Sequence, residues 1–346
     1  MQIAGRAISS KMPPYLIAEA SSNHCGDFNT ALALISAAKT AGADAVKFQA
    51  YTPDTITLDC DKADFVIKDG LWKGRRLYEL YQKCHTPLEW FSSLFRHARE
   101  LGITAFASVF DAKSVDALEA LECPAYKIAS MEVTDTNLIG YVAKTGKPLI
   151  ISTGMASEEE VFDASAAADV TPYAIDNVAM LACVSGYPMK VEAANLSRLK
   201  WLQRYYSQVG ISDHTLGWEV PIAATALGAT IIEKHLMIPT QQDPEDVAFS
   251  LLPQEFSMMA DKVRRTWQAM QPSDNTTEDS SRQLRRSLYV VQDIKRGERF
   301  TRDNVRSIRP SYGLPPRYLW DILDKTATQD ISYGTALKWS MVEGET

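Results

Sequence analysis

Short apolar runs recur along the first 235 residues, and glycine, proline or polar turn residues bound each of them. Runs of this length that are apolar throughout are typical of strands buried on both faces. The runs that we predict to be strands are Tyr15–Glu19, Ala45–Ala50, Ile103–Ser108, Ala125–Ala129, Pro148–Thr153, Asn177–Val184, Gln208–Ser212 and Ala229–His235.

Stretches with the apolar period of a helix lie between these runs, namely Thr30–Thr40, Pro87–Leu101, Ala112–Leu121, Glu158–Ala168 and Val220–Leu227. Eight strand-then-helix units within about 270 residues predict an α/β fold, the (β/α)8 TIM barrel. A doubly wound open sheet is the alternative, but no GxGxxG follows the first strand.

The segment Gln271–Ser281 is polar and has no apolar periodicity, which indicates a linker. We therefore expect a barrel over 1–270, a linker over 271–282 and a second domain over 283–346. About 65 residues make a marginal independent core, so we expect this tail to pack on the barrel or on a second subunit.

Composition and charge exclude several classes of protein. The 346 residues are 46% hydrophobic and 23% charged, and 36 basic against 43 acidic side chains give a net charge of −7 with no basic block, which argues against nucleic acid. No run reaches the roughly 18 residues of a membrane span, and the first residues lack the apolar segment of a signal peptide. Five cysteines without a CxxC pair suit a reduced cytoplasm, where we expect the protein to reside.

Polar side chains stand at the carboxyl ends of the predicted strands, where the active sites of such barrels lie. They are Glu19, Lys47, Gln49, Ser108, Lys127, Ser130, Glu132, Ser152, Ser185, Tyr187, Ser212, His214, Glu233 and His235. Because a lysine within a buried strand needs a partner, Lys47 and Lys127 with the hydroxyls predict a cradle for a phosphorylated anion. For any single serine, a helix cap or a solvated strand end is the favoured explanation, whereas the set taken together favours a functional site.

Two of the five histidines, His214 and His235, end adjacent predicted strands. Their rings could hold one divalent cation and leave positions open for water and substrate. A pair of satisfied core imidazoles is the alternative. His24 follows the first strand, and we expect it to line the same mouth.

The connection between the second and third strands is unusually long and contains Trp72 between two polar turns. Connections of this length in a compact barrel are typical of a lid or a specificity element. A helical insertion packed on the barrel rim is the alternative.

Several segments together resemble the nonulosonic (sialic) acid synthase family. These are IAEASSNHCGD, AGADAVKFQAYTPDTITLD, YKIASME, ISTGMAS, GISDHTLGW and IIEKHLM in the barrel, and RSLYVVQDIKRGERFTRDNVRSIRPSYGL in the tail. The tail is similar to the family's C-terminal antifreeze-like (SAF) domain. The stretch FVIKDGLWKGRRLYELY looks most like the pseudaminic acid synthase branch.

This resemblance implies a transferase that condenses phosphoenolpyruvate with the open-chain aldehyde 2,4-diacetamido-2,4,6-trideoxy-L-altrose, giving pseudaminic acid and phosphate with Mn²⁺ or Mg²⁺. It implies phosphoenolpyruvate contacts from Lys47, Ser108, Lys127, Ser130, Ser152, Ser212 and, where the family often has asparagine, Ser185. His214 and His235 would be the metal ligands, and Glu19, Gln49, Tyr187 and Asp246 would contact the sugar. In a homodimer, Arg309 would reach the partner's barrel.

Two further expectations concern catalysis. Glu19 and Glu132 are the candidates for proton transfer, and Val109 replaces a proline common in the family. The alternatives are a synthase of legionaminic or N-acetylneuraminic acid, which the Trp72 connection and Gln241–Asp246 would distinguish, a carbohydrate-binding barrel without catalysis, or a lyase with a Schiff base on Lys47 or Lys127.

Overall fold

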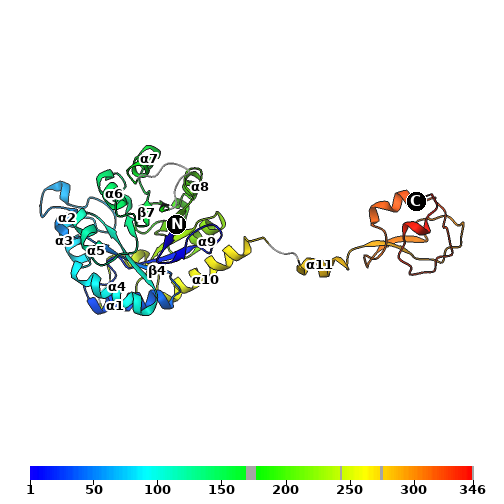
Figure 1. Cartoon of the computed structure of the whole chain (residues 1–346), viewed down its shortest axis with the longest axis horizontal. Helices are drawn as coiled ribbons and strands as arrows, with labels where there is room; N and C mark the ends of the chain where they lie inside the picture. The colour runs from blue at the N-terminus through cyan, green and yellow to red at the C-terminus, as the bar shows by residue number, and fades with distance from the viewer. Residues whose placement is uncertain (169–176, 242–243, 273–275, 345–346) are drawn as a thin grey trace. The chain divides into compact units, whose positions relative to one another are not determined.

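The computed structural model of the chain describes residues 1–168, 177–241, 244–272 and 276–344. These residues form two compact units, Met1–Gln271 and Pro272–Thr346 (Figure 1). Among the described residues, no helix is both long enough and apolar enough to span a membrane.

Unit 1 contains a closed barrel of eight parallel strands in the order β10-β3-β4-β5-β6-β7-β8-β9. All eight predicted strands are present, with ends that move by one or two residues, so the predicted TIM barrel is confirmed. The strands are β3 (Tyr15–Glu19), β4 (Ala45–Ala50), β5 (Thr104–Val109), β6 (Tyr126–Ile128), β7 (Leu149–Ser152), β8 (Val178–Cys183), β9 (Val209–Asp213) and β10 (Ile231–His235). A hairpin that the apolar pattern did not predict, β1 (Gln2–Ile3) and β2 (Arg6–Ala7), precedes them.

Helices cover the outside of the barrel (Figure 1). The helices of unit 1 are α1 (Phe28–Thr40), α2 (Pro53–Ile56), α3 (Leu77–Cys84), α4 (Phe91–Leu101), α5 (Ala112–Glu119), α6 (Thr136–Ala143), α7 (Glu158–Ala167), α8 (Ser197–Leu202), α9 (Glu219–Ala226) and α10 (Pro253–Ala269). Of these, α2 and α3 lie in the connection after β4. Polar caps fix where several begin: the Asp27 carboxylate accepts from the Thr30 N–H, and Ser157 forms a capping box with Glu160.

Alternation along each strand decides which side chains reach the barrel interior. On β4, Phe48 points outward and packs edge-on against Phe91 of α4, whereas Lys47 and Gln49 face inward as predicted. Because both faces are covered, all five residues of β3 are buried, which explains why the strands are mostly apolar except where side chains line the cavity.

Unit 2 has a hydrophobic core of its own. It contains α11 (Thr276–Arg282), β11 (Ser287–Val290), β12 (Val305–Ile308) and α12 (Leu319–Ile322). Its buried apolar residues are Leu288, Val290, Ile294, Phe300, Val305, Ile322, Ala327, Ile331, Leu337 and Val342.

Helix α11 lies within the segment 271–282 that we expected to be an irregular linker, of which residues 273–275 lie outside the described part. The sequence of this helix has no apolar stripe, and charged side chains stabilise it instead of apolar packing. Acidic residues occupy its first turn, and Arg282 pairs with Asp279 one turn earlier at 3.2 Å.

Candidate active site

A cavity of about 380 Å³ opens where the carboxyl ends of the barrel strands meet. Of the residues that the sequence singled out, those that line it are Glu19, Lys47, Gln49, Ser108, Lys127, Ser130, Glu132, Ser152, Tyr187, Ser212, His214, His235 and Asp246. Ser185 is not among the lining residues, and Arg309 belongs to unit 2. The cluster expected at the strand ends therefore exists within unit 1.

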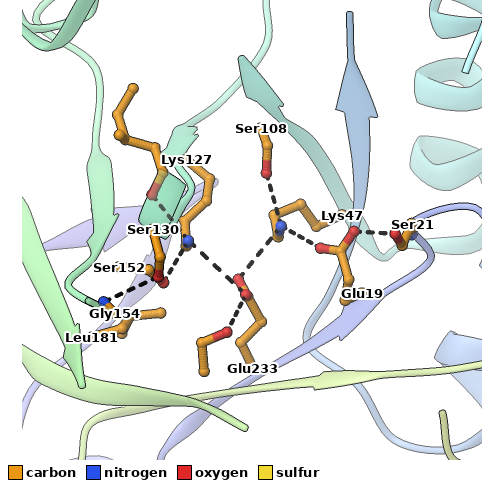
Figure 2. A network of polar contacts seen from close by, with 12 residues as sticks. Glu19, Ser21, Lys47, Ser108, Lys127, Ser130, Ser152, Gly154, Leu181 and Glu233 are labelled. Atoms are coloured by element: carbon orange, nitrogen blue, oxygen red, sulfur yellow. Dashed lines mark hydrogen bonds and ion pairs between the residues drawn. The ribbon is translucent and has the colours of Figure 1, made fainter. Parts of the chain in front are cut away.

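Lys47 joins the first three strands of the barrel. Its ammonium donates to Ser108 Oγ at 2.8 Å and forms an ion pair with Glu19, whose other oxygen accepts the Ser21 N–H at 2.9 Å (Figure 2). Burial acts to lower the pKa of Lys47, but the carboxylates of Glu19 and Glu233 outweigh it and the pKa is raised. Lys47 is therefore a fixed positive charge.

Lys127 lies next to this group, among the strand-end residues that line the bottom of the cavity. Its ammonium donates to Ser152 Oγ at 2.6 Å and to the Ile128 carbonyl at 3.0 Å, and it lies 4.0 Å from Glu233 Oε1 (Figure 2). Burial lowers the pKa of Lys127 because the attraction of Glu233 does not fully compensate for lost solvation. An anionic ligand would supply the missing compensation.

Glu233 is the central acid of this network, and sequence reasoning gave it no role. Its Oε1 accepts from Ser212 Oγ at 2.8 Å, and its Oε2 lies 3.7 Å from the Lys47 ammonium. Burial acts to raise the pKa of Glu233, but Lys127 and Lys47 dominate and the pKa is lowered. The sequence could have indicated this position, since period two places Glu233 on the inward face of β10 together with His235.

Glu19 and Glu132 are the acids with the opposite shift. Burial raises the pKa of Glu19 to about 7, and the nearby Glu233 carboxylate adds to the rise while Lys47 opposes it. Burial also raises the pKa of Glu132 to about 7. Glu132 Oε2 is buried and has no hydrogen-bond partner among the described residues. Both carboxyls can therefore exchange protons near neutral pH.

Serine hydroxyls and a glycine form a small recess beside Lys127. The Gly154 N–H donates to Ser130 Oγ at 3.1 Å. A Cβ at position 154 would lie 2.6 Å from Ser185 Oγ and 2.7 Å from Ser130 Oγ, so only glycine fits. Ser130, Ser152 and the adjacent Lys127 offer several donors in one place, as a phosphate requires.

His214 and His235 lie side by side, with ring centroids 5.3 Å apart. Burial lowers the pKa of His214 to about 4 and lowers that of His235 well below its usual value, so both rings are neutral as metal ligands must be. His214 Nδ1 lies 3.2 Å from the Val184 carbonyl, which orients the ring. His235 Nδ1 has no hydrogen-bond partner in the described part of the chain, although Asp246 Oδ2 lies 3.6 Å away.

These residues fit a divalent cation held by two imidazoles with further positions left for ligand or water. No group of three or more His, Cys, Asp or Glu suited to a metal occurs among the residues that the structure describes. A catalytic metal site of this kind keeps coordination positions open for water or substrate.

The long connection after β4 forms one wall of the cavity. Ile56, Ile67, Trp72, Leu77 and Leu80 of this connection all line it. The Trp72 ring lies 6.0 Å from the ring of Tyr187, which in turn lies 4.4 Å from that of His214. The alternative of an insertion packed only on the rim is therefore excluded.

Two other expectations have clear outcomes. His24 does not line the cavity, because its ring packs edge-on against Trp90 and its Nε2 lies 3.1 Å from Thr86 Oγ1. None of the five cysteines forms a disulfide bond in the described structure, and burial raises the pKa of Cys84 to about 12, which argues against a thiolate nucleophile there.

Comparisons with known proteins identify the family of the chain. The chain matches the NeuB family over residues 34–275 and the SAF domain over residues 285–343. It is 43% identical to the pseudaminic acid synthase of Campylobacter jejuni over 98% of each chain, and 34% identical to that bacterium's N,N'-diacetyllegionaminic acid synthase over 91% of this chain and 96% of the relative. The crystal structure of the spore coat polysaccharide biosynthesis protein SpsE from Bacillus subtilis superposes with a TM-score of 0.64 at 31% identity, covering 100% and 99% of the two chains.

Proposed function

The chain belongs to the NeuB family, and we propose that it is a pseudaminic acid synthase, which joins phosphoenolpyruvate to 2,4-diacetamido-2,4,6-trideoxy-L-altrose and releases phosphate. The observation that carries this proposal is the placement of two buried lysines and two neutral histidines around one cavity. The greater similarity to the pseudaminic than to the legionaminic acid synthase of the same bacterium supports the choice of sugar.

Phosphoenolpyruvate carries a phosphate and a carboxylate, and Lys47 and Lys127 are the only cationic side chains in the described lining of the cavity. We assign the phosphate to Lys127 with Ser130, Ser152 and the recess at Gly154, and the carboxylate to Lys47 with Ser108. The lysines neutralise these anions in every state of the reaction, so they contribute to binding at least as much as to rate.

His214 and His235 would hold a divalent metal, Mn²⁺ or Mg²⁺, which supplies Lewis-acid polarisation of the aldehyde oxygen. C3 of phosphoenolpyruvate forms the new C–C bond with the aldehyde carbon, and positive charge develops at C2. Water adds at C2, and the resulting tetrahedral carbon loses phosphate by C–O cleavage, which leaves the 2-keto acid. The two protons of that water end on the former aldehyde oxygen, which becomes a hydroxyl, and on the released phosphate.

The two raised-pKa carboxyls differ in what they can do. Both oxygens of Glu19 are engaged, one by the Ser21 N–H and one by Lys47, so this acid positions Lys47 and the sugar. Glu132 Oε2 has no partner among the described residues and belongs to a lining residue. We therefore assign to Glu132 Oε2 the proton that the water loses as it adds at C2.

Sugar contacts from Gln49, Tyr187 and Asp246 belong to the same proposal, and so does Arg309 of a second subunit in a homodimer. Residues 242–243 of the segment Gln241–Asp246, which would distinguish the related sugars, lie outside the described part. Cytoplasmic residence remains part of this proposal as well.

The test is phosphate release by purified protein supplied with phosphoenolpyruvate and Mn²⁺, with the diacetamido-trideoxy-altrose and N-acetylmannosamine offered separately. We expect release with the altrose derivative only, its loss in EDTA and its return with added Mn²⁺. Phosphate release with N-acetylmannosamine alone would overturn the choice of sugar, and absence of phosphate release with either sugar would overturn the proposal.

His214→Ala tests the metal assignment against a matched histidine. We expect it to abolish release and the binding of Mn²⁺ measured directly on the protein. His97→Ala is the control, because His97 lies on α4 against Ser36 and does not line the cavity. Retained Mn²⁺ binding in His214→Ala would remove the residue from the metal site.

A further inference from the structure

The cavity has two chemically different halves. Its floor is formed by strand-end residues that carry charge, whereas one wall is formed by the connection after β4 and is mainly apolar. We call Ile56, Ile67, Trp72, Leu77 and Leu80 the apolar wall. A phosphorylated three-carbon acid has no use for such a wall, so the wall must face the other reactant.

Trp72 is the one residue of the apolar wall with a hydrogen-bond donor in its side chain. Its indole Nε1 is buried and has no hydrogen-bond partner among the described residues. A buried N–H without an acceptor is unfavourable, and native proteins rarely leave one unless a ligand or water completes it. The ring lies against Tyr187, whose own ring contacts His214 at a tilted angle, so the indole is close to the proposed metal site.

Main-chain and charged contacts hold Trp72 in this place. The residues on either side of it pair in a tight hairpin, in which the Ile67 N–H donates to the Arg75 carbonyl at 2.9 Å and the Gly74 N–H donates to the Ile67 carbonyl at 2.8 Å. Arg75 and Lys83 then both bond Glu245, at 2.6 and 2.7 Å. A donor fixed in this way can select among ligands rather than adapt to each.

We propose that Trp72 is a specificity-determining residue whose indole N–H donates to the carbonyl oxygen of an acetamido group on the acceptor sugar. The apolar wall packs on the acetamido methyl groups and on the deoxygenated C6 of the same sugar. This inference rests on the proposed function, and it adds the contacts by which a deoxygenated, N-acetylated sugar is distinguished from a polyhydroxylated one.

The first test replaces Trp72 by phenylalanine, which removes the N–H and keeps an aromatic ring. We expect KM for the diacetamido sugar to rise about fivefold to tenfold, while KM for phosphoenolpyruvate changes by less than about twofold. Trp201→Phe is the control, because Trp201 packs on Phe162 and Tyr205 away from the cavity. Equal changes in both KM values would overturn the proposal.

Phenylalanine is smaller than tryptophan, so a second variant separates the N–H from ring size. Incorporation of 3-benzothienylalanine at position 72 replaces the N–H by sulfur and keeps the shape of the ring. We expect the same rise in sugar KM with an unchanged melting temperature. An unchanged sugar KM in this variant would mean that the effect of phenylalanine comes from packing, and it would refute the proposed hydrogen bond.

A substrate analogue identifies which group Trp72 contacts. Replacing one acetamido group of the sugar by hydroxyl should raise the sugar KM of the wild-type enzyme. If the removed group is the one that the indole contacts, the same replacement should raise the sugar KM of Trp72→Phe by a smaller factor. If the effects of the Trp72 variant and of the analogue on KM are additive for both acetamido positions, the inference is overturned. Because the wild-type enzyme is assayed first, absence of phosphate release would instead indicate failure of the proposed function.

Discussion

Strands β9 and β10 carry two buried ionic clusters on opposite faces, and the two differ in how completely they are closed. On the outward face, the Lys234 ammonium donates to Asp213 Oδ2 at 2.6 Å and to the Thr215 carbonyl. Asp213 Oδ1 accepts from the Thr215 N–H at 3.1 Å and from its hydroxyl at 2.9 Å. Both charged side chains are completely buried.

The inward face of the same strands is open by comparison. Glu233 Oε2 has no hydrogen bond with the described residues, and its nearest cation, Lys47, lies 3.7 Å away. Lys127 is 4.0 Å from the same carboxylate, and a cavity of about 380 Å³ adjoins the group. A buried ion pair that satisfies all its partners indicates a structural role, whereas one left incomplete beside a cavity indicates a ligand site.

Removing one member of the outward cluster should have the largest effect on folding. Lys234→Met leaves the Asp213 carboxylate buried without a counter-charge, so we expect the free energy of unfolding in urea to fall by about 3–5 kcal/mol. The double variant Lys234→Met with Asp213→Asn should recover part of this loss, because no unpaired charge remains. A loss below about 1 kcal/mol for the single variant would contradict the structural role.

Lys127→Met is the matched change on the inward face, and its effect should fall on activity. We expect kcat/KM for phosphoenolpyruvate to fall by about 10²–10³, because one of the two cations that face its phosphate and carboxylate is lost. The free energy of unfolding should change by less than about 1 kcal/mol, since Glu233 keeps Ser212 and the cavity admits water. Destabilisation as large as that of Lys234→Met would erase the distinction between the two faces.

The sequence carried enough information for the barrel and for most of the site. Strands that are buried on both faces are mainly apolar, which made the barrel strands recognisable in the sequence. Period two assigns Lys47 and Gln49 to one face, so the sequence alone could place the residues at the strand ends together. His24 was misplaced because it follows β3 in a turn, where no periodicity fixes the direction of a side chain.

Other features depend on distances that a pattern cannot supply. Glu233 could be seen to face inward, but its position between Lys47 and Lys127 depends on the register of strands that are far apart in sequence. Trp72 stood out within a long connection, yet only the folded hairpin shows that its N–H is buried without a described partner. Cross-strand geometry, rather than residue type, separates the Lys234 cluster from the Lys127 cluster.

Glu132→Gln has the smallest expected effect, a gain in stability that should appear at the higher pH only. The carboxyl pKa rises from 4.5 to about 7 on folding, so the folded protein binds more protons between these values, and this group lowers the free energy of unfolding as pH rises through that window. Glutamine cannot ionise, so the variant should be more stable than wild type by about 1–3 kcal/mol at pH 8 and by little at pH 5. Urea unfolding at the two pH values measures this, with the exposed Glu100→Gln on α4 as a control that should change by less than about 0.5 kcal/mol at both. A gain that is equal at both pH values would mean that packing, and not the buried charge of the Glu132 carboxylate, explains it.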